Sequence, residues 1–325
     1  MKTRIIVAAI LLPVFFAVLF VFPSYILTFV ISAICAIAAY ELLHAVKITN
    51  KRVLVYTIIV SVFTPMAVYL SGMLRTVPGD TQSALILITL LLSIAFILLC
   101  LLLIEVVLTF KLGKAVSPKA SRTNPASVDR NGSSKTVPEN NENTDINAQK
   151  KLKFRHIPIA LAAGILIPYM LSALISLRTL PYGHLFVLLP IVAAFLTDSG
   201  AYFVGVTVGK TKAFPTISPN KTVEGYIGGI ITGIVGMLIY GIILSYTTPL
   251  TIVYTALIIY GILGAIMTEL GDLTFSLIKR KCGIKDYGKL IPGHGGAMDR
   301  FDSMTFAAPT MYLLMLVLPA IIYNV

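Results

Sequence analysis

The chain consists of long apolar runs separated by short polar segments. Nine runs approach the length of a membrane-spanning helix, which takes about 20 residues. They cover residues 5–21, 25–46, 53–70, 83–110, 157–177, 185–206, 223–245, 252–270 and 304–323. The pattern therefore predicts an all-α polytopic membrane protein with about nine transmembrane helices.

Composition supports this interpretation. Hydrophobic residues make up 57% of the 325 positions and charged residues 12%, whereas soluble domains carry about 25% charged residues. The three cysteines, Cys35, Cys100 and Cys282, form no CxxC pair. Neither a disulfide framework nor a zinc site is therefore indicated.

One polar segment interrupts the apolar pattern for much longer than the others. Residues 113–150 are rich in Ser, Asn, Thr, Pro and Glu and contain few large apolar side chains. Such a segment cannot bury a core, so we predict a disordered cytoplasmic linker, either a spacer or a regulatory element. It divides the chain into an N-terminal four-helix membrane region, residues 1–112, and a C-terminal five-helix membrane domain, residues 151–325, which carries the candidate catalytic residues.

The distribution of basic residues predicts the orientation. With the N-terminus in the cytoplasm, all of the 26 Lys and Arg residues except Arg75 and Arg178 lie on the cytoplasmic side, as expected from the positive-inside rule. The net charge of +12 would then attract anionic membrane lipids. We expect an integral protein of a bacterial plasma membrane, because no organelle-targeting signal is evident.

Acidic residues mark the candidate site. Seven of the 14 lie in the C-terminal half, near predicted cytoplasmic helix ends: Asp198, Glu224, Glu269, Asp272, Asp286, Asp299 and Asp302. Carboxylates in or beside a membrane span are costly and usually functional. Several of them on one face, among Lys and Arg, are typical of a site for divalent metal and phosphate.

Asp198 lies inside the sixth run, in the stretch LTDSGAYFVG. The small residues Ser199, Gly200 and Gly205 are explained by close helix packing. Packing does not explain an aspartate within a span, so Asp198 is a candidate substrate-binding residue.

The stretch SPNKTVEG precedes the seventh run. Its Ser218, Lys221 and Thr222 offer phosphate-binding groups beside a helix N-terminus, where free N–H groups favour anions. Glu224 follows in the same stretch. The alternative is an interfacial turn with a lysine that reaches toward water. The spacing of a P-loop is absent.

The segment from Ser276 to Asp302 is the richest in candidate chemistry. Asp299 and Asp302 are three positions apart, so they share a face if they open the ninth helix. Asp272 is expected to end the eighth helix and to meet them across the loop. Three such carboxylates suit Mg²⁺, which prefers oxygen ligands. The alternative is a basic interfacial loop with Asp–Lys pairs.

The motifs in this half of the chain resemble those of the phosphatidate cytidylyltransferases, also called CDP-diacylglycerol synthases. The resemblance is strong from about residue 194 to 303, and Ala297 departs from the usual larger aliphatic residue. The matching signature positions are Ser276, Lys279, Arg280, Lys285, Asp286, Gly288, Pro292, His294, Gly295, Gly296, Asp299, Arg300 and Asp302.

The resemblance implies that CTP and phosphatidate react to CDP-diacylglycerol and diphosphate, with Mg²⁺ as the cofactor and a second cation left open. The implied catalytic residues are Asp272, Lys279, Arg280, Asp286, His294, Asp299, Arg300 and Asp302, with Asp272, Asp299 and Asp302 on the metal. His294 could bind phosphate, act as a general acid or order the glycine loop. The implied substrate-binding residues are Asp198, Ser218, Lys221, Thr222, Glu224, Lys285, Gly295 and Gly296.

The expected partners are CTP, phosphatidate and membrane lipids, and a homodimer is left open. Nucleic acid is not expected as a partner. One alternative is a related CTP-dependent lipid kinase or a cytidylyltransferase acting on another lipid. The other is a secondary transporter, but its site would lie near the bilayer midplane, whereas these acids gather on one face.

Overall fold

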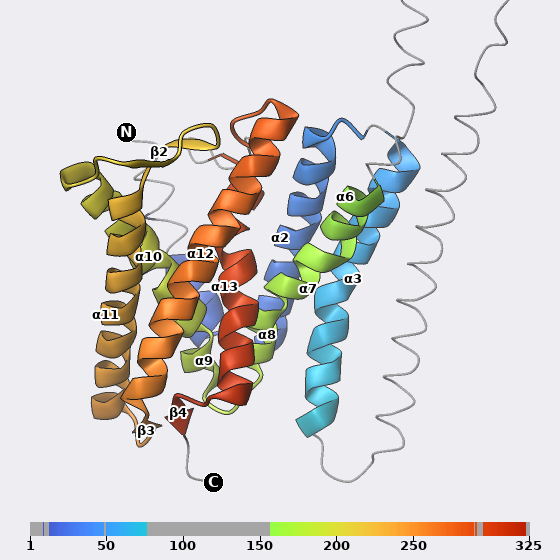
Figure 1. The fold of residues 1–325 in the computed structure, drawn as a ribbon. Coiled ribbons are helices and arrows are strands. Elements are labelled where there is room, and N and C mark those ends of the chain that lie inside the picture. The colour runs from blue at the N-terminus through green and yellow to red at the C-terminus, as the bar shows by residue number, and fades with distance from the viewer. Residues whose placement is uncertain are drawn as a thin grey trace, which may run out of the picture.

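A computed structural model describes residue 9, residues 13–76 apart from 49, and residues 157–322 apart from 289 and 291–294 (Figure 1). The predicted fourth span, part of the first span and the 113–150 linker lie outside these ranges. The long helices are α2 (Ser24–Ala45), α3 (Lys51–Thr76), α10 (Leu188–Thr207), α11 (Val223–Thr247), α12 (Tyr254–Cys282) and α13 (Met298–Val317).

Six described stretches are long and apolar enough to cross a membrane, as expected of an integral membrane protein. They are residues 24–45, 51–73, 158–178, 183–207, 223–247 and 254–282, and each coincides with a predicted span. The predicted ninth span corresponds to α13, which is not among the six. Its first turns carry Asp299, Arg300 and Asp302. The count of nine spans therefore stays a prediction.

The predicted fifth span is a series of short helices. It comprises α6 (Ile157–Leu161), the π-helix η2 (Ala162–Leu166), α7 (Ile167–Leu171) and α8 (Ala173–Arg178), and α9 (Gly183–Phe186) follows. Pro168 has no N–H to donate to the preceding turn, and the wider π-helical turn ends two residues before it, at Leu166.

Helix α12 is longer than predicted. The apolar run ends at residue 270, but the helix continues to Cys282 through polar and basic residues. Asp272 therefore lies inside the helix, and the prediction that it ends the helix was wrong. Gly283 provides the termination, with φ 71°, and its N–H donates to the carbonyl of Arg280 at 3.1 Å. Glycine adopts this left-handed conformation without a steric penalty.

Two small antiparallel sheets accompany the helices, so the all-α prediction was incomplete. Strands β1 (Lys212–Phe214) and β2 (Ser218–Thr222) pair with Lys212 opposite Thr222. Strands β3 (Thr251–Ile252) and β4 (Ile321–Ile322) pair at the other end of the bundle (Figure 1). The SPNKT stretch is thus an edge strand, where Pro219 is tolerated because its missing N–H breaks no central ladder.

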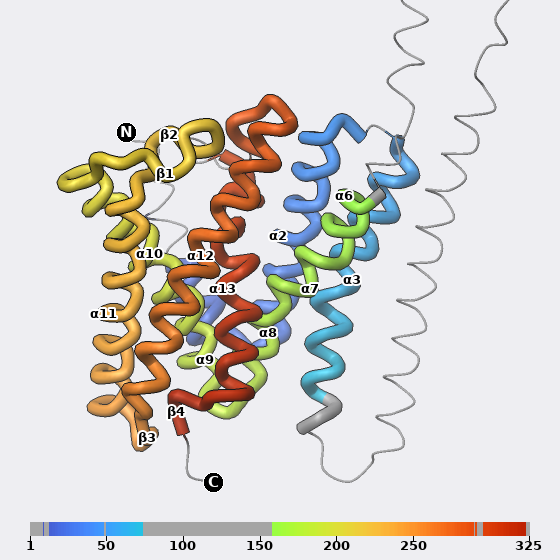
Figure 2. The backbone as a smooth tube through the Cα atoms, viewed as in Figure 1, coloured from blue at the N-terminus to red at the C-terminus, as the bar shows by residue number. Residues whose placement is uncertain are grey.

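Helix α13 packs between two groups of helices (Figure 2). On one side lie α10, α11 and α12, and on the other lie α2, α7 and α8. Glycines let α11 approach α10 closely: a Cβ at Gly228 would overlap Val204, and one at Gly236 would overlap Leu196. Small residues permit such packing between membrane helices. The N-terminal helices α2 and α3 pack against residues 157–178, so packing crosses the predicted boundary between the two membrane regions.

Candidate functional site

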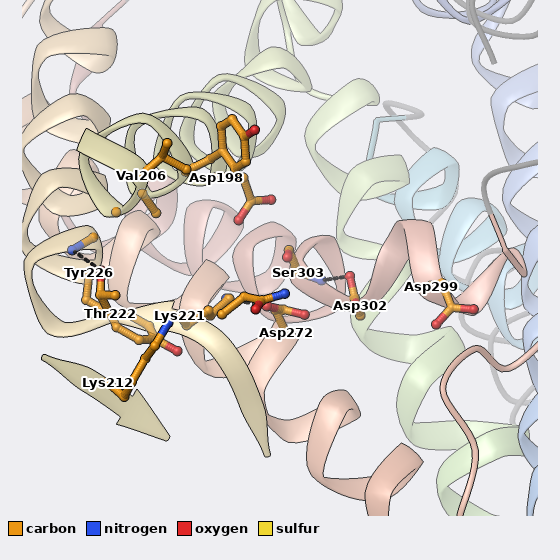
Figure 3. Close-up of a pocket in the computed structure, with 15 residues that line it drawn as sticks. Asp198, Val206, Lys212, Lys221, Thr222, Tyr226, Asp272, Asp299, Asp302 and Ser303 are labelled. Atoms are coloured by element: carbon orange, nitrogen blue, oxygen red, sulfur yellow. Dashed lines mark hydrogen bonds and ion pairs between the residues drawn. The ribbon is translucent and has the colours of Figure 1, made fainter. Parts of the chain in front are cut away.

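A cavity of about 600 Å³ opens between α10, β2, α11, α12 and α13. Its lining includes Asp198, Asp272, Asp299 and Asp302, together with Lys221 (Figure 3). Lys212, Lys221 and Thr222 of the lining belong to the β1–β2 hairpin, which lies at the end of the bundle opposite β3 and β4 (Figure 1). The structure therefore brings carboxylates that are about 100 residues apart in the chain to one cavity. This separation is far longer than one helix turn.

Lys221 forms an ion pair with Asp272, which joins β2 to α12. Figure 3 shows its side chain extending toward that carboxylate, with Asp198 above it on α10. The ammonium also lies 5.3 Å from the centre of the Tyr226 ring, within cation–π range. Burial disfavours the charged form of Lys221, but Asp272 and the other neighbours outweigh it and raise the pKa of the lysine. Lys221 is thus a cation at neutral pH.

Lys279 holds the other pair of carboxylates. Its ammonium donates to Oδ1 of Asp299 at 2.9 Å and lies 4.0 Å from Oδ2 of Asp302. The whole residue is 9% exposed, so this charge is shielded from water on most sides. The Tyr287 ring lies 5.5 Å away. Asp299 and Asp302 both meet Lys279, which confirms that their spacing places them on one side of α13.

Asp299 is oriented by the loop between α12 and α13. Its Oδ2 accepts hydrogen bonds from the backbone N–H groups of Tyr287 at 2.8 Å and Gly296 at 3.0 Å. Gly295 has φ 85°, a conformation that glycine adopts readily. The loop therefore fixes one oxygen of Asp299, and Lys279 contacts the other.

Asp272, Asp299 and Asp302 form the acidic wall of the cavity. Ser276 donates to Oδ1 of Asp272 at 3.4 Å, and the backbone N–H of Ser303 donates to Oδ1 of Asp302 at 2.8 Å. Within the described part of the chain, no three Asp, Glu, His or Cys side chains are grouped as a ready-made metal site. Mg²⁺ commonly uses only one or two carboxylates and takes its remaining ligands from water and substrate phosphates. The oxygen donors of this wall fit that requirement.

Some predicted residues of the SPNKTVEG stretch line the cavity, and others stabilise the segments around it. Thr222 lines the cavity and caps α11, because its side chain accepts from the N–H of Gly225 at 3.1 Å. Glu224 accepts from the backbone N–H groups of Lys210 and Thr211 at 3.1 Å each. Glu224 therefore holds the loop before β1. Ser218 lies at the far end of β2, opposite Phe214.

Arg280 supports the hairpin and is not among the described lining residues of the cavity. Arg280 donates to the carbonyl of Ile217 at 3.0 Å and so ties α12 to the hairpin. Lys285, Asp286 and Arg300 are exposed, and they are not among the described residues that line the cavity. His294 lies outside the described residues. The chemical roles assigned to these four residues stay predictions.

Several residues of the site were missed in the sequence. Tyr202, Lys212, Asn220 and Tyr226 also line the cavity. Glu41, on α2, accepts hydrogen bonds from the backbone of the loop before Asp299. A signal for Glu41 was available, because it is a carboxylate within a predicted span. Its distance in the chain from every other acid concealed the connection.

The sequence of the chain is similar to a known protein family and to several curated proteins. The model of the cytidylyltransferase family matches residues 2–318. The chain is 40% identical over 163 residues to a phosphatidate cytidylyltransferase of Bacillus subtilis, a match that covers 50% of this chain and 59% of that protein. It is 41% identical over 134 residues to one of Staphylococcus saprophyticus, covering 41% of this chain and 50% of that protein. The matched parts thus span only about half the length of these curated relatives.

Proposed function

Because the chain belongs to the cytidylyltransferase family, we propose that it is a phosphatidate cytidylyltransferase. The proposed reaction converts CTP and phosphatidate to CDP-diacylglycerol and diphosphate. The relatives named above carry that name. The observation that supports it best is the cavity, where Lys221 meets Asp272 and where the lining residues Asp299 and Asp302 are contacted by Lys279.

The chemistry asks mainly for positioning and charge neutralisation. A phosphate oxygen of phosphatidate attacks the α-phosphorus of CTP, and the bond from that phosphorus to the oxygen bridging to the β-phosphate breaks. Diphosphate leaves with the electron pair. Such transfer gains most from oriented substrates and fixed charges. Lys221 and Lys279 are the cations that pair with carboxylates of the cavity, and each can exchange a carboxylate partner for a phosphate oxygen.

We propose Mg²⁺ as the cofactor, held by Asp272 with Asp302 or Asp299. A bound Mg²⁺ would supply further neutralisation of phosphate charge. The carboxylates then serve two purposes in turn, as partners of the lysines without substrate and as metal ligands with it.

In the proposed orientation the cavity opens on the cytoplasmic side, where CTP is present. Among the described residues, Lys47, Lys51, Arg52 and the basic residues of the hairpin and of the α12 terminus belong to the segments at this end of the bundle (Figure 1). Arg178 ends α8, at the opposite side. This asymmetry matches the positive-inside rule. A cavity at the membrane edge can admit a soluble triphosphate from one side and a lipid phosphate from the other.

A labelling experiment tests the reaction. Purified protein is incubated with Mg²⁺, vesicles containing phosphatidate, and CTP labelled at either the α- or the γ-phosphorus. We expect the α-label to enter the lipid and the γ-label to leave as diphosphate. Chelation of Mg²⁺ should stop turnover, and added Mg²⁺ should restore it.

Two results would contradict the proposal. Transfer of the γ-label to a lipid alcohol such as dolichol would identify a lipid kinase. Absence of any CTP turnover in folded protein, with phosphatidate present, would exclude the enzyme and favour a transporter.

A further inference from the structure

Glu41 connects the N-terminal part of the chain to the candidate site. It lies on α2, is 5% exposed, and faces the beginning of α13. Its Oε1 accepts from the backbone N–H of Ala297 at 3.1 Å, and its Oε2 accepts from that of Met298 at 2.9 Å. Both N–H groups belong to the first turn of α13, which has no intrahelical acceptors for them. Glu41 thus caps a helix that begins about 250 residues later, a role usually filled by a neighbouring residue.

The same carboxylate is enclosed by two glycines of the α12–α13 loop. A Cβ at Gly288 would overlap the Glu41 side chain, and a Cβ at Gly296 would also collide with its carboxylate. These glycines lie near the start and the end of the loop. Glu41 therefore lies close against both glycines, and a side chain at either position would displace it.

The backbone that encloses Glu41 is the backbone that orients Asp299. Tyr287 and Gly296 donate their N–H groups to Oδ2 of Asp299 at 2.8 and 3.0 Å. Tyr287 precedes Gly288, and Gly296 precedes Ala297. Asp299 thus binds the residues that directly precede Gly288 and Ala297, two positions that Glu41 contacts, and it meets Lys279 at 2.9 Å.

We propose that Glu41 is a positioning residue for the reaction, acting through the α12–α13 loop. Its carboxylate binds the N–H groups of Ala297 and Met298 and lies against Gly288, which keeps Asp299 and Lys279 in the fixed geometry that the substrate phosphates require. This role rests on the proposed function. It assigns the N-terminal helices a part in catalysis, although the cavity itself is lined by residues 198–303.

The test is Glu41→Gln in the full-length protein. Glutamine has nearly the same shape, but its amide nitrogen is a donor and cannot accept from a backbone N–H. One N–H of the α13 turn therefore loses its partner. We expect kcat to fall about 10- to 100-fold, as when supporting groups around an active centre are removed. The KM for CTP should change little, and the melting temperature should stay near that of the wild type.

Two further variants separate positioning from folding. Glu41→Asp keeps two acceptor oxygens on a shorter side chain, so it should recover part of the lost kcat. Ser32→Ala is the matched control, because Ser32 is buried on the same helix and donates to the carbonyl of Val62 on α3 at 3.2 Å. It should leave kcat unchanged. Wild-type kcat in Glu41→Gln, or an equal loss in all three variants, would overturn the proposal.

Limited trypsin digestion gives a readout that does not depend on turnover. Lys281 and Lys285 are exposed beside or within the loop, and cleavage there should be faster in Glu41→Gln than in the wild type or in Ser32→Ala. Equal cleavage rates in Glu41→Gln and the wild type would contradict the proposal that Glu41 holds the loop. If the wild type lacks turnover with phosphatidate, the proposed function fails, whereas the digestion still decides whether Glu41 holds the loop.

Discussion

At the scale of single residues, two lysines organise the site. Each joins a carboxylate on another segment: Lys221 of β2 meets Asp272 of α12, and Lys279 of α12 meets Asp299 of α13. An ion pair of this kind gives geometric definition even where its net stabilisation is small. Because phosphate can replace the carboxylate partner, we propose that the same lysines bind the phosphates of the substrate.

Replacing Lys279 tests this role. Lys279→Met removes the cation but keeps the apolar stem of the side chain, and we expect kcat/KM for CTP to fall about 100-fold, the typical loss when a fixed charge in an active site is removed. Lys281→Met is the control, because Lys281 is exposed on the same last turn of α12. Steady-state kinetics of both variants provide the measurement. An equal effect of the two substitutions would indicate a nonspecific role of surface charge.

At the scale of elements, the β1–β2 hairpin determines where Lys221 lies. The hairpin is anchored at three points: Arg280 binds the carbonyl of Ile217, Glu224 binds the loop before β1, and Thr222 caps α11. These contacts turn a short polar stretch into a fixed strand. Lys221 is consequently held beside Asp272 by a strand and not by a helix of the bundle.

Substitution of Thr222 should loosen this arrangement. Thr222→Ala removes the side-chain acceptor for the N–H of Gly225 and should lower stability by about 1 kcal/mol, the usual value for a lost helix cap. Turnover should fall as well, because Lys221 is the adjacent residue. Thr222→Ser retains the hydroxyl and should restore both properties. Thermal unfolding in detergent and a CTP assay measure the two effects, and a serine variant as impaired as the alanine variant would contradict the capping role.

At the scale of the whole molecule, the cavity is lined by one part of the chain. All of its described lining residues fall between Asp198 and Ser303. The N-terminal helices contribute at a distance, through the packing of α2 against α13 and the contact from Glu41.

Deletion of residues 113–149 tests whether the linker is only a spacer. Because the composition of the linker is that of a segment that buries no core, the shortened protein should keep its kcat and its KM for CTP. A protein that elutes as a folded species but has lost turnover would show a regulatory or assembly role for the linker. Removing the N-terminal helices α2 and α3 is not equivalent, because they pack against residues 157–178.

Much of this arrangement could be predicted from the sequence. Apolar runs of spanning length predict helices because a bilayer leaves few other ways to satisfy the backbone, and six of the predicted spans have matching helices. The spacing of Asp299 and Asp302 predicts a shared face because helical geometry is local. The end of α12 could not be predicted in this way, since hydrophobicity marks where a span ends and does not mark where the helix ends.

The sequence alone thus determined the membrane class, the family motifs and the residues that carry the charge. Only the tertiary structure decided which charges meet. Lys221 pairs with Asp272, and Glu41 with the backbone of Ala297 and Met298, because packing brings distant segments together. Periodicity and local spacing describe neighbours within one helix. Contacts between helices depend on how glycines, caps and loops let whole elements approach, and the site is made of such contacts.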